Sequence, residues 1–68
     1  MSVYRVTEII GTSTKNWEDA ARVALAAAAS TLRDLRVAEV VTQDLTLTEK
    51  GEVESFRTKL RVSFKYEK

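Results

Sequence analysis

The sequence contains no cysteine, no histidine and no proline among its 68 residues. Without cysteine there is no disulfide framework and no thiolate nucleophile, and without histidine there is no imidazole base and no zinc site of the Cys/His kind. Any metal bound by this chain must therefore be a hard cation held by oxygen ligands. The carboxylates are scattered and the hydroxyls have no imidazole partner, so no pattern indicates an enzyme.

Large apolar side chains are also scarce. Hydrophobic residues make up 44% of the chain, but eight of them are alanines, and there are only five aromatic residues. A chain this short buries about 60% of the surface that it exposes when unfolded, and it usually needs a further stabilising element. Because disulfides and zinc are excluded, we expect oligomerisation to supply that stability.

The charges nearly cancel, with 11 basic residues against 10 acidic ones and a formal net charge of +1. This balance gives no overall argument for binding to nucleic acid or to an anionic membrane. Arg5 and Glu8 interrupt the first apolar stretch, so it does not have the pattern of a secretory signal. No apolar run is long enough to span a bilayer. We therefore expect a soluble, cytoplasmic protein.

Local patterns predict a first strand and a helix. Residues 3–10 are rich in β-branched side chains and are typical of a strand, which we expect Gly11 to end. Asn16 is a plausible helix N-cap, and strong helix formers follow from Trp17 to about Arg33. The many alanines of this helix allow other elements to approach it closely.

Two long strands are predicted after the helix, over residues 36–48 and 53–66, with Gly51 in the turn over residues 49–52. The second alternates clearly between apolar and basic positions. The order is β-α-β-β, an α+β class, in a single domain over residues 1–68. Strands of 13 residues span about 43 Å, whereas a 17-residue helix spans about 26 Å. Either the sheet curls around the helix or the excess length packs on other subunits.

One face of the last strand carries a row of basic side chains: Arg57, Lys59, Arg61 and Lys65. This row favours a nucleic-acid-binding module as one alternative. Glu39 and Asp44 on the preceding strand offer a simpler interpretation, in which acidic side chains neutralise the row across the strands. Exposed aromatic residues for base stacking are lacking, so nucleic-acid binding is the weaker hypothesis.

Three further features have structural and functional interpretations. Residues 11–14 (GTST) resemble a phosphate-binding loop faintly, but they lack its spacing and are typical of a turn. Trp17 is interpreted as a core anchor or an interface residue. Gln43 and Asp44 are polar residues in the middle of a strand, where solvent exposure, a ligand pocket or a subunit contact explains them.

Four segments together carry a resemblance to a known family: VYRVTEIIGTS, WEDA at the start of an alanine-rich helix, LRDLRVAEVV, and KLRVSFKYE. In order, spacing and length, residues 2–67 resemble the dodecin family. The resemblance implies a three-stranded antiparallel sheet wrapped around one helix. It also implies that twelve copies form a hollow sphere. Flavin-binding members sandwich pairs of flavins between subunits and buffer them without turnover.

The positions that bind flavin in such members differ here. Val37 stands where the stacking tryptophan is expected, and valine has no π face. Arg57 stands at a glutamine position that pairs with the flavin edge, and arginine only donates. Asp44 stands where some members hold a phosphate with arginine, whereas Lys65 keeps the charge of a second basic position. The resemblance therefore implies a degenerate site for FMN or riboflavin.

The stretch from Arg36 to Asp44, with its Gln43, resembles a tryptophan-less branch of the family that is associated with calcium. Glu39 and Asp44 are the candidate ligands for Ca²⁺ or Mg²⁺, since symmetry can bring several copies of one carboxylate together. We therefore predict a homododecamer with a storage or small-ligand-binding role and no catalysis, with a flavin-buffering dodecin as the alternative.

Overall fold

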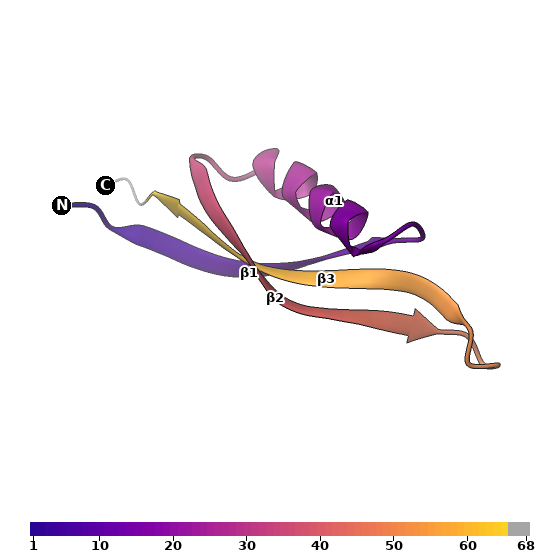
Figure 1. Ribbon diagram of the computed structural model, residues 1–68. Helices are drawn as coiled ribbons and strands as arrows, with labels where there is room; N and C mark the ends of the chain where they lie inside the picture. The colour runs from indigo at the N-terminus through magenta and orange to yellow at the C-terminus, as the bar shows by residue number, and fades with distance from the viewer. Residues whose placement is uncertain (66–68) are drawn as a thin grey trace.

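A computed structural model describes residues 1–65 of the chain (Figure 1). Its elements follow the order β-α-β-β, as the sequence predicts: strand β1 (Tyr4–Ser13), helix α1 (Trp17–Ala29), strand β2 (Leu35–Leu47) and strand β3 (Val53–Lys65). The last predicted strand also included Tyr66, which lies outside the described residues. Over residues 1–65, no helix is both long and apolar enough to cross a membrane.

The three strands form one antiparallel sheet in the order β1-β3-β2. β2 and β3 form a hairpin, whose turn contains Gly51 in the expected positive-φ conformation (φ 84°). α1 carries the chain from β1 across to β2, so that β3 lies in the centre and the other two strands form the edges. The three-stranded antiparallel sheet with one helix is confirmed.

α1 begins where the sequence predicts but ends earlier. The Asn16 side chain accepts a hydrogen bond from the backbone N–H of Asp19 at 2.6 Å, which confirms the N-cap. The expected continuation to Arg33 is wrong, because the hydroxyls of Ser30 and Thr31 bond back to the last helical carbonyls. Asp34 then takes a left-handed conformation (φ 57°), which turns the chain into β2.

Gly11 does not end the first strand, contrary to the sequence-based expectation. β1 continues to Ser13, and Gly11 is buried opposite Thr58. A Cβ atom at this position would collide with the carbonyl oxygen of Ala20 and would lie 2.9 Å from the Cβ of Ala24. At Gly11 the helix therefore approaches the strand so closely that only a residue without a side chain fits.

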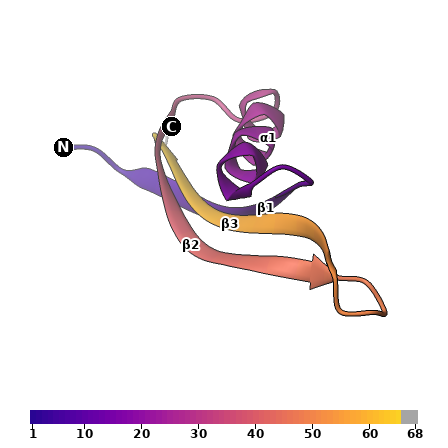
Figure 2. The same cartoon turned by 45° about the vertical axis from the view of Figure 1, so that its right-hand side comes forward.

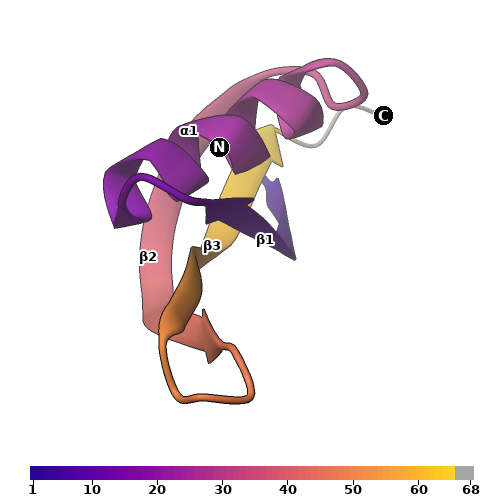
Figure 3. The same cartoon turned by 90° about the vertical axis from the view of Figure 1, so that its right-hand side faces the viewer.

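The core is small and lies between α1 and the strands β1 and β3. Its buried apolar side chains within residues 1–65 are three alanines of the helix and two β3 residues: Ala20, Ala24, Ala28, Leu60 and Val62. The alanines let α1 lie close to the sheet, on one side only (Figure 3). The opposite face of the sheet has no covering layer from residues 1–65.

Trp17 lies at the end of the core that is next to the start of α1. Its ring meets the Phe56 ring edge-on at 5.2 Å between centroids, and its indole N–H donates to the carbonyl of Asp44 at 3.0 Å. The buried hydroxyl of Thr58 donates to the carbonyl of Trp17 at 2.8 Å. These contacts tie the start of the helix to β2 and β3, in agreement with the interpretation of Trp17 as a core anchor.

The molecule is strongly elongated, with extents of 51 × 19 × 15 Å. Its radius of gyration is 14.0 Å, whereas a compact chain of this length has about 11 Å. The far end of the β2–β3 hairpin extends well beyond the helix (Figures 1 and 2). The prediction that the helix is too short to cover the hairpin is confirmed.

Candidate functional site

The candidate site lies on the face of the sheet that points away from α1, which we call the outer face. The strand register arranges it in rows that run across β1, β3 and β2. One row consists of Glu8, Arg61 and Glu39, and a second one of Thr12, Arg57 and Asp44. The central strand supplies the basic member of each row and the edge strands supply the acidic ones.

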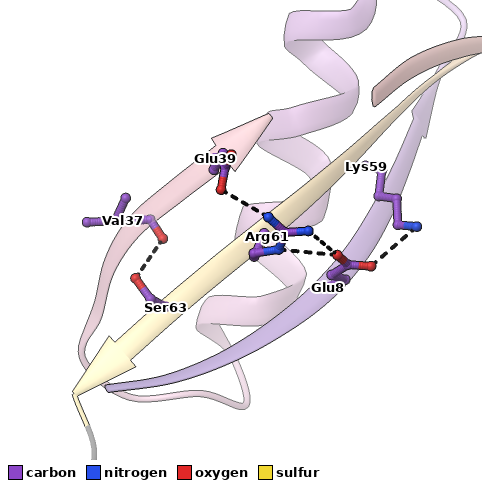
Figure 4. A network of polar contacts seen from close by, with 6 residues as sticks. All are labelled: Glu8, Val37, Glu39, Lys59, Arg61 and Ser63. Carbon is purple, nitrogen blue, oxygen red and sulfur yellow. Dashed lines mark hydrogen bonds and ion pairs between the residues drawn. The ribbon is translucent and has the colours of Figure 1, made fainter. Parts of the chain in front are cut away.

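Arg61 lies at the centre of an ion-pair network (Figure 4). Its guanidinium donates to Glu8 at 2.9 Å and to Glu39 at 3.3 Å, and the Lys59 ammonium lies 3.3 Å from the second oxygen of Glu8. The hydrogen bond from Arg61 is the largest cause that lowers the pKa of Glu8, followed by that from Lys59. The same bond from Arg61 to Glu8 raises the pKa of Arg61.

Asp44 and Arg57 form the second contact of the outer face. The pair is bidentate, with Nε and Nη2 of Arg57 at 2.7 and 2.8 Å from the two carboxylate oxygens. The hydrogen bond from Arg57 lowers the pKa of Asp44. Both side chains are less than half exposed. The geometry leaves neither group free in the isolated subunit.

A β-bulge brings the two acidic residues of β2 onto one face. Residues five apart in a regular strand point to opposite faces. The register of β2 shifts between Val40 and Thr42, so Val41 is an extra residue, and Glu39 and Asp44 both face the basic side of β3. The predicted cross-strand neutralisation is thereby confirmed. Three of the four basic residues named from the sequence are ion-paired, which removes much of the case for nucleic-acid binding.

The two candidate cation ligands do not meet within one subunit. Glu39 and Asp44 lie opposite β3 residues that are four positions apart, Arg61 and Arg57, which corresponds to about 13 Å along a strand. Across residues 1–65, no cluster of three or more Asp, Glu, His or Cys side chains is able to hold a metal ion. One subunit therefore offers no ready-made carboxylate cluster around Glu39 or Asp44 within residues 1–65.

The positions associated with flavin are also spread out. Val37 lies opposite Ser63, six β3 residues away from Arg57, or about 20 Å. Lys65 lies near the free end of β3, opposite Tyr4. Gln43 lies opposite the buried Thr58, so the register places it on the α1 side of the sheet. Of the predicted ligand-binding positions, only Asp44 and Arg57 are in contact with each other.

Two features of the site were not found from the sequence. Glu8 is the most heavily paired carboxylate of the outer face. It shares its face of β1 with Val6 and Ile10, whereas the buried Gly11 and Ser13 lie on the other face. An open, mostly apolar pocket of about 290 Å³ lies between α1 and the start of β2. Its walls come from three elements: Leu25, Ala29, Leu35, Arg36, Val37, Ala38 and Val62.

The segment with a faint likeness to a phosphate loop is a capped turn, as its residue types predict. The Ser13 hydroxyl donates to Asp19 at 2.6 Å and accepts from the backbone N–H of Lys15 at 2.9 Å. These bonds connect the end of β1 to the first turn of α1 and engage the Ser13 hydroxyl in the turn itself.

Comparisons with known proteins agree with the fold. A family model for dodecin matches residues 3–67. The calcium dodecin of Mycobacterium tuberculosis is 48% identical over 65 residues, which cover 96% of this chain and 90% of that protein.

Solved structures are similar over the whole chain. The dodecin of Streptomyces coelicolor superposes with a TM-score of 0.91 at 34% identity. The match covers 98% of this chain and 94% of the S. coelicolor chain. A crystal structure of the M. tuberculosis calcium dodecin, described as calcium-chelating with a novel calcium-binding site, superposes with a TM-score of 0.85 at 45% identity. The match covers 97% of this chain and 93% of the M. tuberculosis chain.

Proposed function

Since the chain belongs to the dodecin family, we propose that it is the subunit of a homo-oligomer that stores or sequesters a small ligand, with a divalent cation favoured over flavin. In this proposal twelve copies form a hollow shell, and the shell catalyses no reaction. The oligomer supplies the stability that the small core lacks, and its symmetry brings together the side chains that are far apart in one subunit.

The observation that carries the assembly is the surface area. The chain exposes 5195 Å², whereas a folded monomer of this size exposes about 4300 Å². The difference, on the order of 900 Å², is what one partner contributes to an interface of standard size. The elongated shape also supports assembly. Neighbouring copies would cover the hairpin and the outer face, which α1 leaves exposed.

The side chains favour a cation over flavin. Val37 supplies no π face for an isoalloxazine ring, and Arg57 is held by Asp44. Asp44 and Glu39 supply hard oxygen donors on one face, which suits Ca²⁺ once symmetry-related copies add their own. The 48% identity to a calcium dodecin supports the same assignment.

The lowered pKa values of Glu8 and Asp44 support a role without catalysis. A general acid that works near neutral pH needs a raised carboxyl pKa, and ion pairing does the opposite at both positions. These carboxylates stay ionised at pH 7, which is the state that a cation ligand requires.

One set of measurements tests the proposal. Size-exclusion chromatography with light scattering gives the mass of the native particle, and a particle of about twelve subunits is expected. Thermal unfolding is then followed with Ca²⁺, with Mg²⁺ and with chelator, and the cation should raise the midpoint. Riboflavin and FMN are titrated in parallel by fluorescence quenching. A monomer refutes the assembly, and sub-micromolar flavin binding without a cation effect replaces the cation assignment with the flavin alternative.

A further inference from the structure

We propose that the pocket between α1 and the start of β2 binds a small amphipathic anion, a free aliphatic carboxylate whose chain enters the pocket and whose head group pairs with Arg36. The pocket has a volume of about 290 Å³, which is at the lower end of the range of about 300–1,000 Å³ for ligand pockets. The inference goes beyond the proposed cation role and requires no bound cation.

The pocket exists because α1 does not cover β2. The helix packs mainly on β1 and β3 and has little contact with β2. Both elements line the gap with an alanine, Ala29 from the helix and Ala38 from the strand. Leu25, Leu35 and the buried Val62 supply further apolar walls. A hydrocarbon chain that enters this space is removed from water, and this burial favours binding.

Arg36 is the charged residue among the side chains that line the pocket. Its side chain is half exposed, and its ion pair within residues 1–65 is with Asp34 at 3.9 Å. This distance is too long for a hydrogen bond, so Asp34 does not occupy the guanidinium donors. A guanidinium at the edge of an apolar pocket is complementary to a carboxylate that carries an apolar chain. The charge of Arg36 therefore favours an anion over a neutral or cationic ligand.

The nearby end of α1 does not oppose an anion strongly. The last turn of a helix carries a partial negative charge on its unpaired carbonyl groups. Here the carbonyl of Ala27 accepts a hydrogen bond from the Ser30 hydroxyl at 2.7 Å, and that of Ala28 accepts one from the backbone N–H of Leu32 at 2.8 Å. These hydrogen bonds satisfy carbonyl groups that would otherwise repel a carboxylate.

The pocket is separate from the ion pairs of the outer face. Val62, which forms part of its wall, lies five β3 residues from Arg57, or about 16 Å along the strand. Among the positions that the family resemblance associates with a ligand, only Val37 borders the pocket. A cation at Asp44 and a carboxylate at Arg36 therefore do not compete for the same side chains.

Calorimetric titration of the native particle with octanoate, in the presence of chelator, tests the proposal. Within the series butanoate, hexanoate and octanoate, each added CH₂ group should strengthen binding by up to about fourfold, because the chain is buried. Octylammonium has the same chain and the opposite charge, and it should bind at least about tenfold more weakly than octanoate. Light scattering before and after the titration checks that the particle keeps its mass.

Two variants, each with a matched control, connect the binding to the pocket. Arg36→Gln should weaken octanoate binding by about three- to tenfold and remove most of the preference over octylammonium. Arg33→Gln is its control, since Arg33 is exposed and lies outside the pocket lining. Ala38→Leu should weaken octanoate binding at least about tenfold, because leucine occupies the space of the chain. Ala26→Leu is its control, since Ala26 is an exposed helix residue outside the lining.

The inference is wrong if octanoate does not bind to the wild type, which is the result expected where a neighbouring copy covers the pocket. It is also wrong if Arg36→Gln and Ala38→Leu bind octanoate as tightly as their controls do. Should Ala38→Leu change the particle mass, Ala29→Leu fills the same pocket from the helix side and takes its place. The effect of Ca²⁺ on thermal unfolding is measured separately, so the cation role and the carboxylate site can fail independently.

Discussion

Gly11 lies under α1 where helix and sheet are in close contact, and its replacement by alanine tests this packing. Alanine in place of glycine in a strand ordinarily stabilises a protein by about 0.4–1 kcal/mol, because it restricts the unfolded chain. Here the new Cβ would collide with the backbone carbonyl of Ala20 and crowd the Cβ of Ala24. A helical carbonyl cannot rotate away, so α1 as a whole must move off the sheet.

Overpacking of this kind typically costs about 1–3 kcal/mol. We expect Gly11→Ala to lie at the upper end of that range, because movement of α1 also loosens the contact of its alanines with Leu60. Gly51→Ala is the control, since a Cβ there meets nothing within 4 Å. Its positive φ alone should cost about 1 kcal/mol.

Urea unfolding followed by Trp17 emission measures both variants, at one protein concentration because assembly makes the midpoint concentration-dependent. Ala24→Gly, combined with Gly11→Ala, should not restore stability, since the collision with the Ala20 carbonyl remains. A Gly11→Ala protein that is as stable as the wild type, or more stable, would show that the helix does not lie as close to β1 as described.

Three further predictions concern the outer face and its ligands. The pKa of Glu8 is lowered from its ordinary value of 4.5 and that of Asp44 from 3.8, so their ion pairs stabilise the fold above these values and lose that effect as the pH falls through the lowered pKa. The thermal midpoint should therefore be level between pH 7 and 5 and fall below pH 4.5, less steeply in Glu8→Gln; an unchanged slope in that variant contradicts the assignment. Asp44→Asn should abolish the rise in midpoint caused by Ca²⁺, whereas Glu18→Gln on the exposed face of α1 should keep it; loss of the rise in both variants would mean that Ca²⁺ acts through general charge. Val37→Trp combined with Arg57→Gln should raise the affinity for riboflavin, measured by fluorescence quenching, by about two- to tenfold, since a stacked aromatic pair contributes about 0.5–1.5 kcal/mol beyond burial; an unchanged affinity would mean that Val37 does not face the ligand.

The element order was predictable because its signals are local. Alternation in β3, the Asn16 cap and the alanine-rich helix each depend on neighbours in sequence. The element ends were less predictable. Glycine interrupts strands in most proteins. Here Gly11 lies inside β1, and the proximity of Ala20 and Ala24 explains why a glycine is needed there. The early end of α1 depends on hydroxyls that bond back to it and on the turn at Asp34.

The site was partly predictable for a similar reason. Opposite charges on adjacent strands indicated that Glu39 and Asp44 neutralise basic residues of β3, and the structure confirms it. The bulge at Val41, which puts both carboxylates on one face, has no clear sequence signal. Glu8 was missed because its partnership with Arg61 joins residues 53 apart in the chain, and only the register of β1 against β3 reveals it.

A single ion pair connects the two ligand hypotheses. Asp44 and Arg57 occupy two of the four positions that the family resemblance associates with flavin, and here they bind each other in a bidentate contact. In this chain the carboxylate of Asp44 therefore neutralises the arginine that stands at the glutamine position. In the proposed site, a divalent cation that binds Asp44 must displace Arg57 from this bidentate pair, and bidentate pairs are among the stronger ion pairs. It follows that Arg57 should compete with the cation, and that Arg57→Gln should bind Ca²⁺ more tightly than the wild type.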